Sequence, residues 1–284
     1  MGLKSIRRLV FNPDVPWLKQ RTRLRAAMVG TRPLFDVTVE SVTVNGVACE
    51  RMTPPRLEKS RKILYVHGGG YCVGSSAMGY GLCSYLAATF NAEVIGVNYR
   101  LAPEHPAPAA VDDVAAVLRS LAGSTVVALG DSAGAGALVA ALQRDVRDVR
   151  SVVLISPWLD VSFERDPRST LAERDPLLSA AWLEACARAY AGEDLANPAV
   201  SPLLGSWGTL PPTLVVGGSD DLLATDARRL AAMGLEHVRV REFAGFWHDF
   251  ALSVGQLAVA DESARLCALH FANATGWRAV NLAL

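Results

Sequence analysis

The stretch GDSAG at residues 130–134 stands between two segments that favour different secondary structures. Residues 125–129 (TVVAL) are apolar and largely β-branched, which is typical of a buried strand. Residues 133–142 are rich in Ala and Leu, which favours a helix. Small residues beside Ser132 allow a sharp strand-to-helix turn in which neighbouring backbone packs closely. Such a turn lifts the serine hydroxyl out of the sheet and points the N–H of Ala133 at a developing oxyanion; the alternative is a Gly/Ser-rich helix N-cap.

Strands and helices alternate along most of the 284 residues. The patterns predict strands at 63–66, 94–98, 126–129, 152–155, 213–216 and 238–243, and helices at 80–90, 109–121, 133–142, 178–190, 225–233 and 257–273. Repeated strand–helix units predict an α/β fold with a doubly wound, mostly parallel sheet. Alternating apolar residues over 37–52, with Asn45-Gly46 between them, predict an antiparallel hairpin ahead of these units. We expect one domain over residues 1–284.

Two segments depart from this alternation. Residues 1 to about 34 are amphipathic and helical in character, and residues 159–208 contain one helix, several prolines and no clear strand. The second segment is an insertion at the carboxyl edge of the sheet, where active sites of open α/β sheets lie. It is therefore placed to act as a lid. The two segments supply bulky apolar side chains, namely Trp17, Met28, Phe163 and Trp182.

A serine nucleophile needs a general base and a carboxylate that orients the base. In this type of fold the partners of Ser132 follow it in the order Asp or Glu, then His, each after a later strand. His248 comes directly after the last predicted strand and is the candidate base. The carboxylate is expected after the strand at 213–216, where either Asp220 or Asp221 could serve and the other would cap a helix or remain a loop charge.

A glycine-rich loop follows the first strand of the alternating units. His67-Gly68-Gly69-Gly70 allows the backbone to turn with its N–H groups exposed, as an oxyanion hole requires. A phosphate-binding loop is the rival interpretation, but the GxGxxG and GxxxxGK[ST] patterns are absent from this sequence. Because His67 precedes Ser132 and leads the glycines, we expect it to brace the loop.

Charge and cysteine content restrict the partners and the compartment. Lys and Arg together number 28, as do Asp and Glu, so the zero net charge argues against a broad nucleic-acid-binding face. The number of cysteines is odd and no CxxC occurs, which favours reduced thiols in a cytoplasmic protein over disulfides or a zinc site. No run of 18 apolar residues is present, and the N-terminus lacks a long apolar segment with a cleavage site, so no membrane span is expected.

Taken together, the motifs resemble the hormone-sensitive-lipase-like family of α/β-hydrolases, the bacterial esterases with an HGGG motif. The matching stretches are HGGGYCVGS (67–75), NYRLAPEHPAPAAVDD (98–113), GDSAG (130–134), SPWLD (156–160), GSDDLL (218–223) and WHDF (247–250). The resemblance implies a catalytic triad and an oxyanion hole, formed by Ser132, Asp220 and His248 and by the N–H groups of Gly69, Gly70 and Ala133. It also implies a helical cap formed by about 1–35 and 159–208.

The resemblance implies a serine carboxylic-ester hydrolase that acts on short- to medium-chain esters through an acyl-enzyme. It also implies that the reaction requires no metal or organic cofactor and that the partner is a small-molecule ester, and it leaves both a monomer and a homodimer open. The alternatives are a lactone or amide hydrolase of the same family and a non-catalytic ligand-binding protein. The sequence departs from the family pattern at Ala135, where Gly is usual, and in the loop around Asp220, which lacks the Asp-Pro-Leu form.

Overall fold

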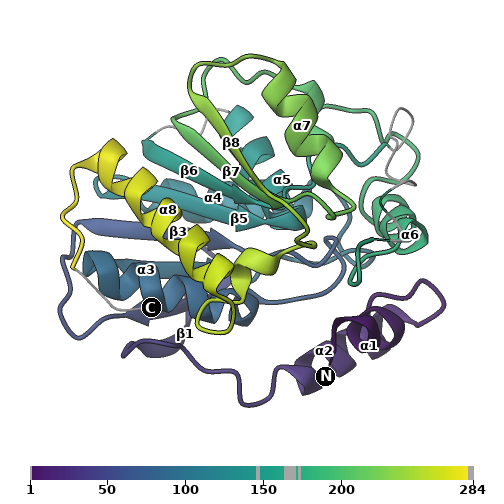
Figure 1. Cartoon of the computed structure of the whole chain (residues 1–284), viewed down its shortest axis with the longest axis horizontal. Coiled ribbons are helices and arrows are strands. Elements are labelled where there is room, and N and C mark those ends of the chain that lie inside the picture. The colour runs from purple at the N-terminus through teal and green to yellow at the C-terminus, as the bar shows by residue number, and fades with distance from the viewer. Residues whose placement is uncertain (1, 145–147, 163–170, 172–173, 281–284) are drawn as a thin grey trace.

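The computed structural model describes residues 2–144, 148–162, 171 and 174–280. Eight strands within these residues form one sheet in the order β1-β2-β4-β3-β5-β6-β7-β8 (Figure 1). Their bounds are β1 Thr38–Val44, β2 Val47–Thr53, β3 Arg61–Val66, β4 Glu93–Val97, β5 Thr125–Asp131, β6 Val149–Ile155, β7 Thr213–Gly218 and β8 Val238–Phe243. The β1–β2 and β2–β4 pairs are antiparallel and all others are parallel, which confirms the predicted fold class and hairpin.

Helices cover both faces of the sheet. Their bounds are α1 Leu3–Leu9, α2 Trp17–Ala27, α3 Tyr80–Phe90, α4 Ala109–Ser120, α5 Ser132–Gln143, α6 Ala180–Ala191, α7 Ala224–Ala232 and α8 Ala258–Thr275, with short 3₁₀ helices at Ser76–Gly79, Pro202–Leu204 and Phe250–Leu252. Successive strand residues point to opposite faces. Leu64 and Ala128 therefore pack with α4, α5 and α7, whereas Ile63 and Val127 pack with α3 and α8.

The N-terminal helices and α6 lie together beyond one end of the sheet (Figure 1). The rings of Phe11 and Trp182 are 4.7 Å apart between centroids. The Trp182 indole N–H donates to Oε1 of buried Gln20 at 2.9 Å. Arg7 donates to the carbonyl oxygen of Asp175 in the insertion at 3.0 Å. The N-terminal segment and the insertion, far apart in the sequence, thus form one packed unit.

The cysteines agree with the expectation of free thiols. All five are unpaired and buried: Cys49, Cys72, Cys83, Cys186 and Cys267. In the part of the chain that the structure describes, no helix combines the length and the apolar character needed to cross a membrane. Phe163, one of the apolar side chains expected in the cap, lies outside the described residues.

Candidate active site

Ser132 lies on a sharp turn between β5 and α5. β5 ends at Asp131, α5 begins at Ser132, and the serine backbone has φ +50°. A non-glycine residue in this left-handed region carries strain of about 1–3 kcal/mol, which the surrounding packing must hold in place. A Cβ at Gly134 would overlap the carbonyl oxygen of Val66, so only glycine permits this approach of α5 to β3. No side chain caps the N-terminus of α5, so Ser132 is not a simple helix cap.

The glycine-rich loop follows β3 and lies beside this turn. Gly69 has φ +106° and Gly70 has φ +61°, a region that side chains rarely tolerate. Within the described residues, neither amide N–H donates to a protein acceptor. The N–H of Ala133 lies in the first turn of α5, where helix geometry supplies no carbonyl partner. Gly69 and Gly70 share a cavity with Ser132, so their donors are available to an anion formed at the serine.

Asp131 fixes the glycine-rich loop to the serine turn. Its Oδ2 accepts the N–H of Gly68 at 2.8 Å and its Oδ1 accepts the Tyr65 hydroxyl at 2.7 Å. Burial, and after it the charge of Asp249, raises the pKa of the Asp131 carboxyl well above its usual range. The sequence did not reveal this contribution, because it depends on a contact between residues from different strands.

His67 braces the same loop, as the sequence predicted. Its Nδ1–H donates to the carbonyl oxygen of Gly68 at 2.7 Å. Its ring stacks on Tyr99 with centroids 4.3 Å apart. Burial lowers the pKa of His67 to about 4, so the ring is neutral at pH 7. His67 is therefore a structural support and not a base for Ser132.

The structure places Asp221, and not Asp220, against the candidate base. Nδ1–H of His248 donates to Oδ1 of Asp221 at 3.0 Å, and both side chains are almost fully buried. The same Oδ1 accepts the N–H of Leu223 at 2.7 Å, which fixes the orientation of the carboxylate. The prediction that Asp220 orients the histidine is therefore corrected to Asp221.

Asp220 makes no contact with His248 among the described residues. Its carboxylate contacts the Ser219 hydroxyl at 3.2 Å and lies 3.7 Å from the guanidinium of Arg174, with 30% of its side chain exposed. The physical reason is the length of β7. The predicted strand ended at Val216, but β7 continues to Gly218, which pairs with Phe243 of β8. The turn thus begins two residues later than expected, and the second aspartate meets the histidine.

Asp175 joins the insertion to the loop that carries Asp221. Its fully buried carboxylate accepts the N–H of Leu222 at 2.9 Å through Oδ2. Its Oδ1 accepts the N–H groups of Leu177 and Leu178 at 2.8 and 3.0 Å. Burial raises the pKa of this carboxyl, and nearby His248 opposes the increase. No local sequence pattern relates Asp175 to a loop 47 residues away, so this contact could not be predicted from the sequence.

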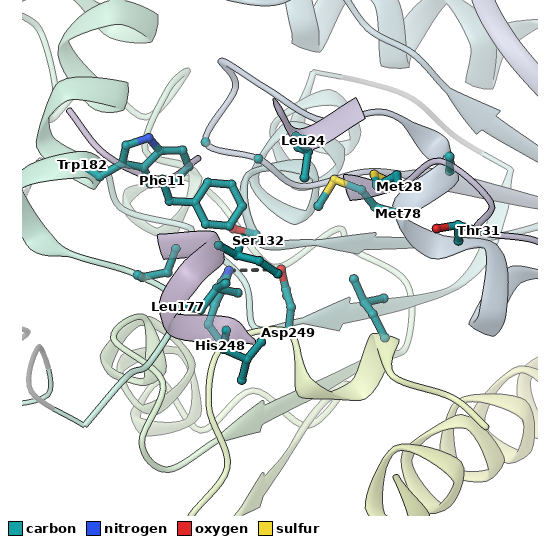
Figure 2. Close-up of a pocket in the computed structure, with 17 residues that line it drawn as sticks. Phe11, Leu24, Met28, Thr31, Met78, Ser132, Leu177, Trp182, His248 and Asp249 are labelled. Carbon is teal, nitrogen blue, oxygen red and sulfur yellow. Dashed lines mark ion pairs between the residues drawn. The ribbon is translucent and has the colours of Figure 1, made fainter. Parts of the chain in front are cut away.

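His248 has a carboxylate on each side of its ring. Nε2 lies 3.1 Å from Oδ2 of Asp249 (Figure 2), while Nδ1 contacts Oδ1 of Asp221 at 3.0 Å. Burial favours the neutral ring, but the charges of Asp249 and Asp221 outweigh it, and both accept hydrogen bonds, so the pKa of His248 is well above its usual range. Ser132 lies next to His248 in the same cavity without a hydrogen bond to it among the described contacts.

The cavity above Ser132 is mainly apolar and holds about 260 Å³. The N-terminal segment contributes Phe11, Leu24 and Met28, and the insertion contributes Leu177 and Trp182 (Figure 2). Of the bulky apolar residues expected from the sequence, Met28 and Trp182 line this cavity, whereas Trp17 packs against the core. The described walls therefore combine an apolar enclosure with a serine, a histidine and two free amide donors.

Comparison with known proteins identifies the family. The α/β-hydrolase fold family matches residues 63–252, which includes the glycine-rich loop, Ser132 and His248. The chain belongs to the α/β-hydrolases. Within this family, it is 40% identical over 206 residues to an acetyl-hydrolase of Streptomyces hygroscopicus, covering 69% of this chain and 68% of that protein. It is 29% identical over 260 residues to an esterase of Acinetobacter venetianus, covering 83% and 86%.

A solved structure extends the likeness to the whole architecture of this α/β-hydrolase. An esterase from the bacterial hormone-sensitive lipase family superposes with a TM-score of 0.87 at 28% identity, covering 96% of each chain. The predicted family, fold and class of enzyme, a carboxylesterase-type hydrolase of the hormone-sensitive-lipase-like family, are thereby confirmed.

Proposed function

We propose that this α/β-hydrolase cleaves short- to medium-chain carboxylic esters with Ser132 as nucleophile, His248 as base and Asp221 as orienting carboxylate. The observation that carries the proposal is the buried His248–Asp221 pair, 3.0 Å apart, in the cavity wall beside Ser132. The acetyl-hydrolase and esterase relatives support the same reaction.

The reaction proceeds through an acyl-enzyme. Oγ of Ser132 attacks the ester carbonyl while Nε2 of His248 takes the hydroxyl proton. The N–H groups of Gly69, Gly70 and Ala133 bind the oxyanion, each contributing about 3 kcal/mol in the transition state. His248 then gives its proton to the leaving alkoxide. A water molecule, deprotonated by the same imidazole, attacks the acyl-enzyme and releases the acid.

The N-terminal segment and the insertion form the cap of the substrate site in this proposal, over about 1–35 and 159–208. Their contact through Phe11, Gln20 and Trp182 supports one closed unit. A cavity of about 260 Å³ lies near the lower end of ordinary ligand sites. Esters with acyl chains of about two to eight carbons are therefore the proposed substrates. Small lactones and amides are competing candidates for the same catalytic residues.

The unpaired, buried cysteines support a reducing compartment, and a cytoplasmic location is proposed on that basis. β8 forms one edge of the sheet, which leaves its outer backbone groups available to a second copy. A homodimer is therefore compatible with the fold, and light scattering of the purified protein distinguishes it from a monomer.

The test is hydrolysis of p-nitrophenyl butyrate by Ser132→Ala. Loss of the nucleophile is expected to lower kcat by at least about 10⁴-fold. Ser120→Ala is the matched control, because Ser120 ends α4 and its hydroxyl contacts only the carbonyl oxygen of Val117 among the described contacts. Full activity in the Ser132 variant, or equal loss in both variants, contradicts the proposal.

A further inference from the structure

Asp249 contacts Nε2 of His248, the imidazole nitrogen with which a nucleophilic serine forms its hydrogen bond. In a serine–histidine–aspartate triad, Nδ1 of the imidazole faces the aspartate and Nε2 faces the serine hydroxyl. Here Nδ1 of His248 contacts Asp221, but Nε2 contacts Oδ2 of Asp249 at 3.1 Å (Figure 2). Asp249, Ser132 and His248 line the same cavity. The two side chains therefore compete for one hydrogen-bonding position.

The backbone holds Asp249 toward the histidine. Its φ is +57°, a left-handed conformation that Asp tolerates better than most residues. Its N–H donates to the Ser156 hydroxyl at 3.0 Å, which joins this loop to the end of β6. The carboxylate is 11% exposed, and Oδ1 is buried without a hydrogen-bond partner among the described residues. Nε2 of His248 is thus the contact that orients this carboxylate.

Within the described residues, four carboxylates from different elements interact electrostatically with His248. Asp221 follows β7, Asp249 follows β8, Asp175 belongs to the insertion and Asp131 ends β5, where it accepts the Tyr65 hydroxyl. Only Asp221 and Asp249 contact the ring directly, one at each nitrogen.

An imidazole that donates through both nitrogens is an imidazolium and cannot accept the proton of Ser132. Once the proton on Nε2 leaves to solvent, Nδ1–H still donates to Asp221, but the lone pair on Nε2 repels the carboxylate of Asp249. Ser132 can then donate its hydroxyl proton to that lone pair. Protonation of His248 and the contact with Asp249 therefore favour each other and oppose the active arrangement.

We propose that Asp249 is a positioning residue that competes with Ser132 for Nε2 of His248 and thereby sets the pH above which the enzyme is active. The inference rests on the ester hydrolysis proposed above. It assigns Asp249 an effect on the free enzyme, through its contact with Nε2 of His248, and no contact with the substrate.

The experiment is the pH dependence of kcat/KM for p-nitrophenyl butyrate, which reports the ionisation of the free enzyme. Product release is followed at a wavelength where both forms of p-nitrophenol absorb equally. Asp249→Asn keeps the shape and removes the charge, and Asp249→Ala removes the competing group. Both variants are expected to move the acid limb of the profile at least about one pH unit lower, since a neighbouring charge shifts a pKa by about 1–3 units.

Asp220→Asn is the matched control, because it removes a neighbouring carboxylate that does not contact His248. Its acid limb is expected to stay in place. An unmoved limb in both Asp249 variants overturns the proposal, as does an equal shift in the Asp220 variant. Folded Asp249 variants that lose activity at every pH also overturn it, because they would show that Asp249 is required for turnover. Failure of the proposed function is distinguished separately, by full activity in Ser132→Ala.

Discussion

Asp221, and not its neighbour Asp220, faces His248, so substitutions of the two residues are expected to have very different effects on catalysis. Asp221→Asn keeps the volume of the side chain but removes the charge that faces Nδ1 of His248 at 3.0 Å. A charge at this distance stabilises the imidazolium by about 1–3 pKa units, or about 1.4–4 kcal/mol. Loss of that stabilisation alone lowers kcat by about 10- to 10³-fold, because imidazolium forms as Ser132 attacks.

Orientation adds to this loss. Oδ1 of Asp221 accepts from both His248 and the N–H of Leu223, whereas Oδ2 is buried without a partner among the described residues. An asparagine with its oxygen at Oδ1 buries an unpaired NH₂ group, which costs about 1–3 kcal/mol. In the flipped orientation, the asparagine NH₂ group faces Nδ1 of His248. It then favours the tautomer with its proton on Nε2, which cannot accept the proton of Ser132, and this change lowers kcat by about 10⁴-fold in other triads. We therefore expect kcat to fall by about 10³- to 10⁴-fold.

The assay is kcat for p-nitrophenyl butyrate in two single variants, with circular dichroism to confirm that each is folded at the assay temperature. Asp220→Asn is the comparison. Because Asp220 is 30% exposed and its pair with Arg174 spans 3.7 Å, the exchange is expected to change kcat less than about threefold. An inactive Asp220 variant beside an Asp221 variant that retains more than a tenth of its activity would refute this reasoning.

Two further predictions concern the cavity and the buried loop histidine. Because the cavity is about 260 Å³, kcat/KM for p-nitrophenyl esters should be highest for acyl chains of about two to eight carbons. Met28 lines the cavity, so Met28→Ala should move this optimum to longer chains. Rapid hydrolysis of emulsified long-chain triglyceride by the unaltered protein would contradict this prediction. The pKa of His67 is about 4 in the folded protein, below the value of about 6.5 in the unfolded chain. Between these two pH values the unfolded chain binds more protons than the folded protein does. The contribution of His67 to stability is therefore lost as pH falls from about 6.5 to about 4. The free energies of unfolding of the unaltered protein and of His67→Gln, measured with urea, should therefore converge as pH falls over that range. A difference between the two free energies that stays constant with pH would show that the ring is not held neutral.

Local patterns predicted the elements that position the site. The β-branched run ahead of GDSAG, the glycines after β3 and the Asn45-Gly46 turn each specify a short segment through its own residues, and the structure contains the expected strand, loop and hairpin. These features depend on backbone preferences of neighbouring residues, which a sequence displays directly.

The assignment of the triad carboxylate depended on the end of β7, where local preference was misleading. Gly217 and Gly218 are poor strand formers, which favoured a strand end at Val216. Pairing with β8 keeps both in the strand, and the Phe246 carbonyl packs so closely on Gly218 that a Cβ there would overlap it. A tertiary contact therefore fixed which aspartate reaches His248.

Asp175 and Asp249 could not be identified for a related reason. The buried carboxylate of Asp175 acts on a loop 47 residues later in the chain. The position of Asp249 at Nε2 of His248 depends on a left-handed backbone and a hydrogen bond to Ser156, 93 residues earlier. Contacts of this kind arise only when separate loops meet at the sheet edge, so no sequence spacing indicates them.

The claim that Ser132 is the nucleophile is tested most directly by covalent labelling. Diethyl p-nitrophenyl phosphate phosphorylates an activated serine and releases p-nitrophenol. Intact-mass measurement and peptide mapping should show one diethylphosphoryl group, located on Ser132, with loss of ester hydrolysis in proportion to labelling. An unlabelled Ser132 in protein that still hydrolyses p-nitrophenyl butyrate, or an inactivating adduct on another residue, would contradict the account.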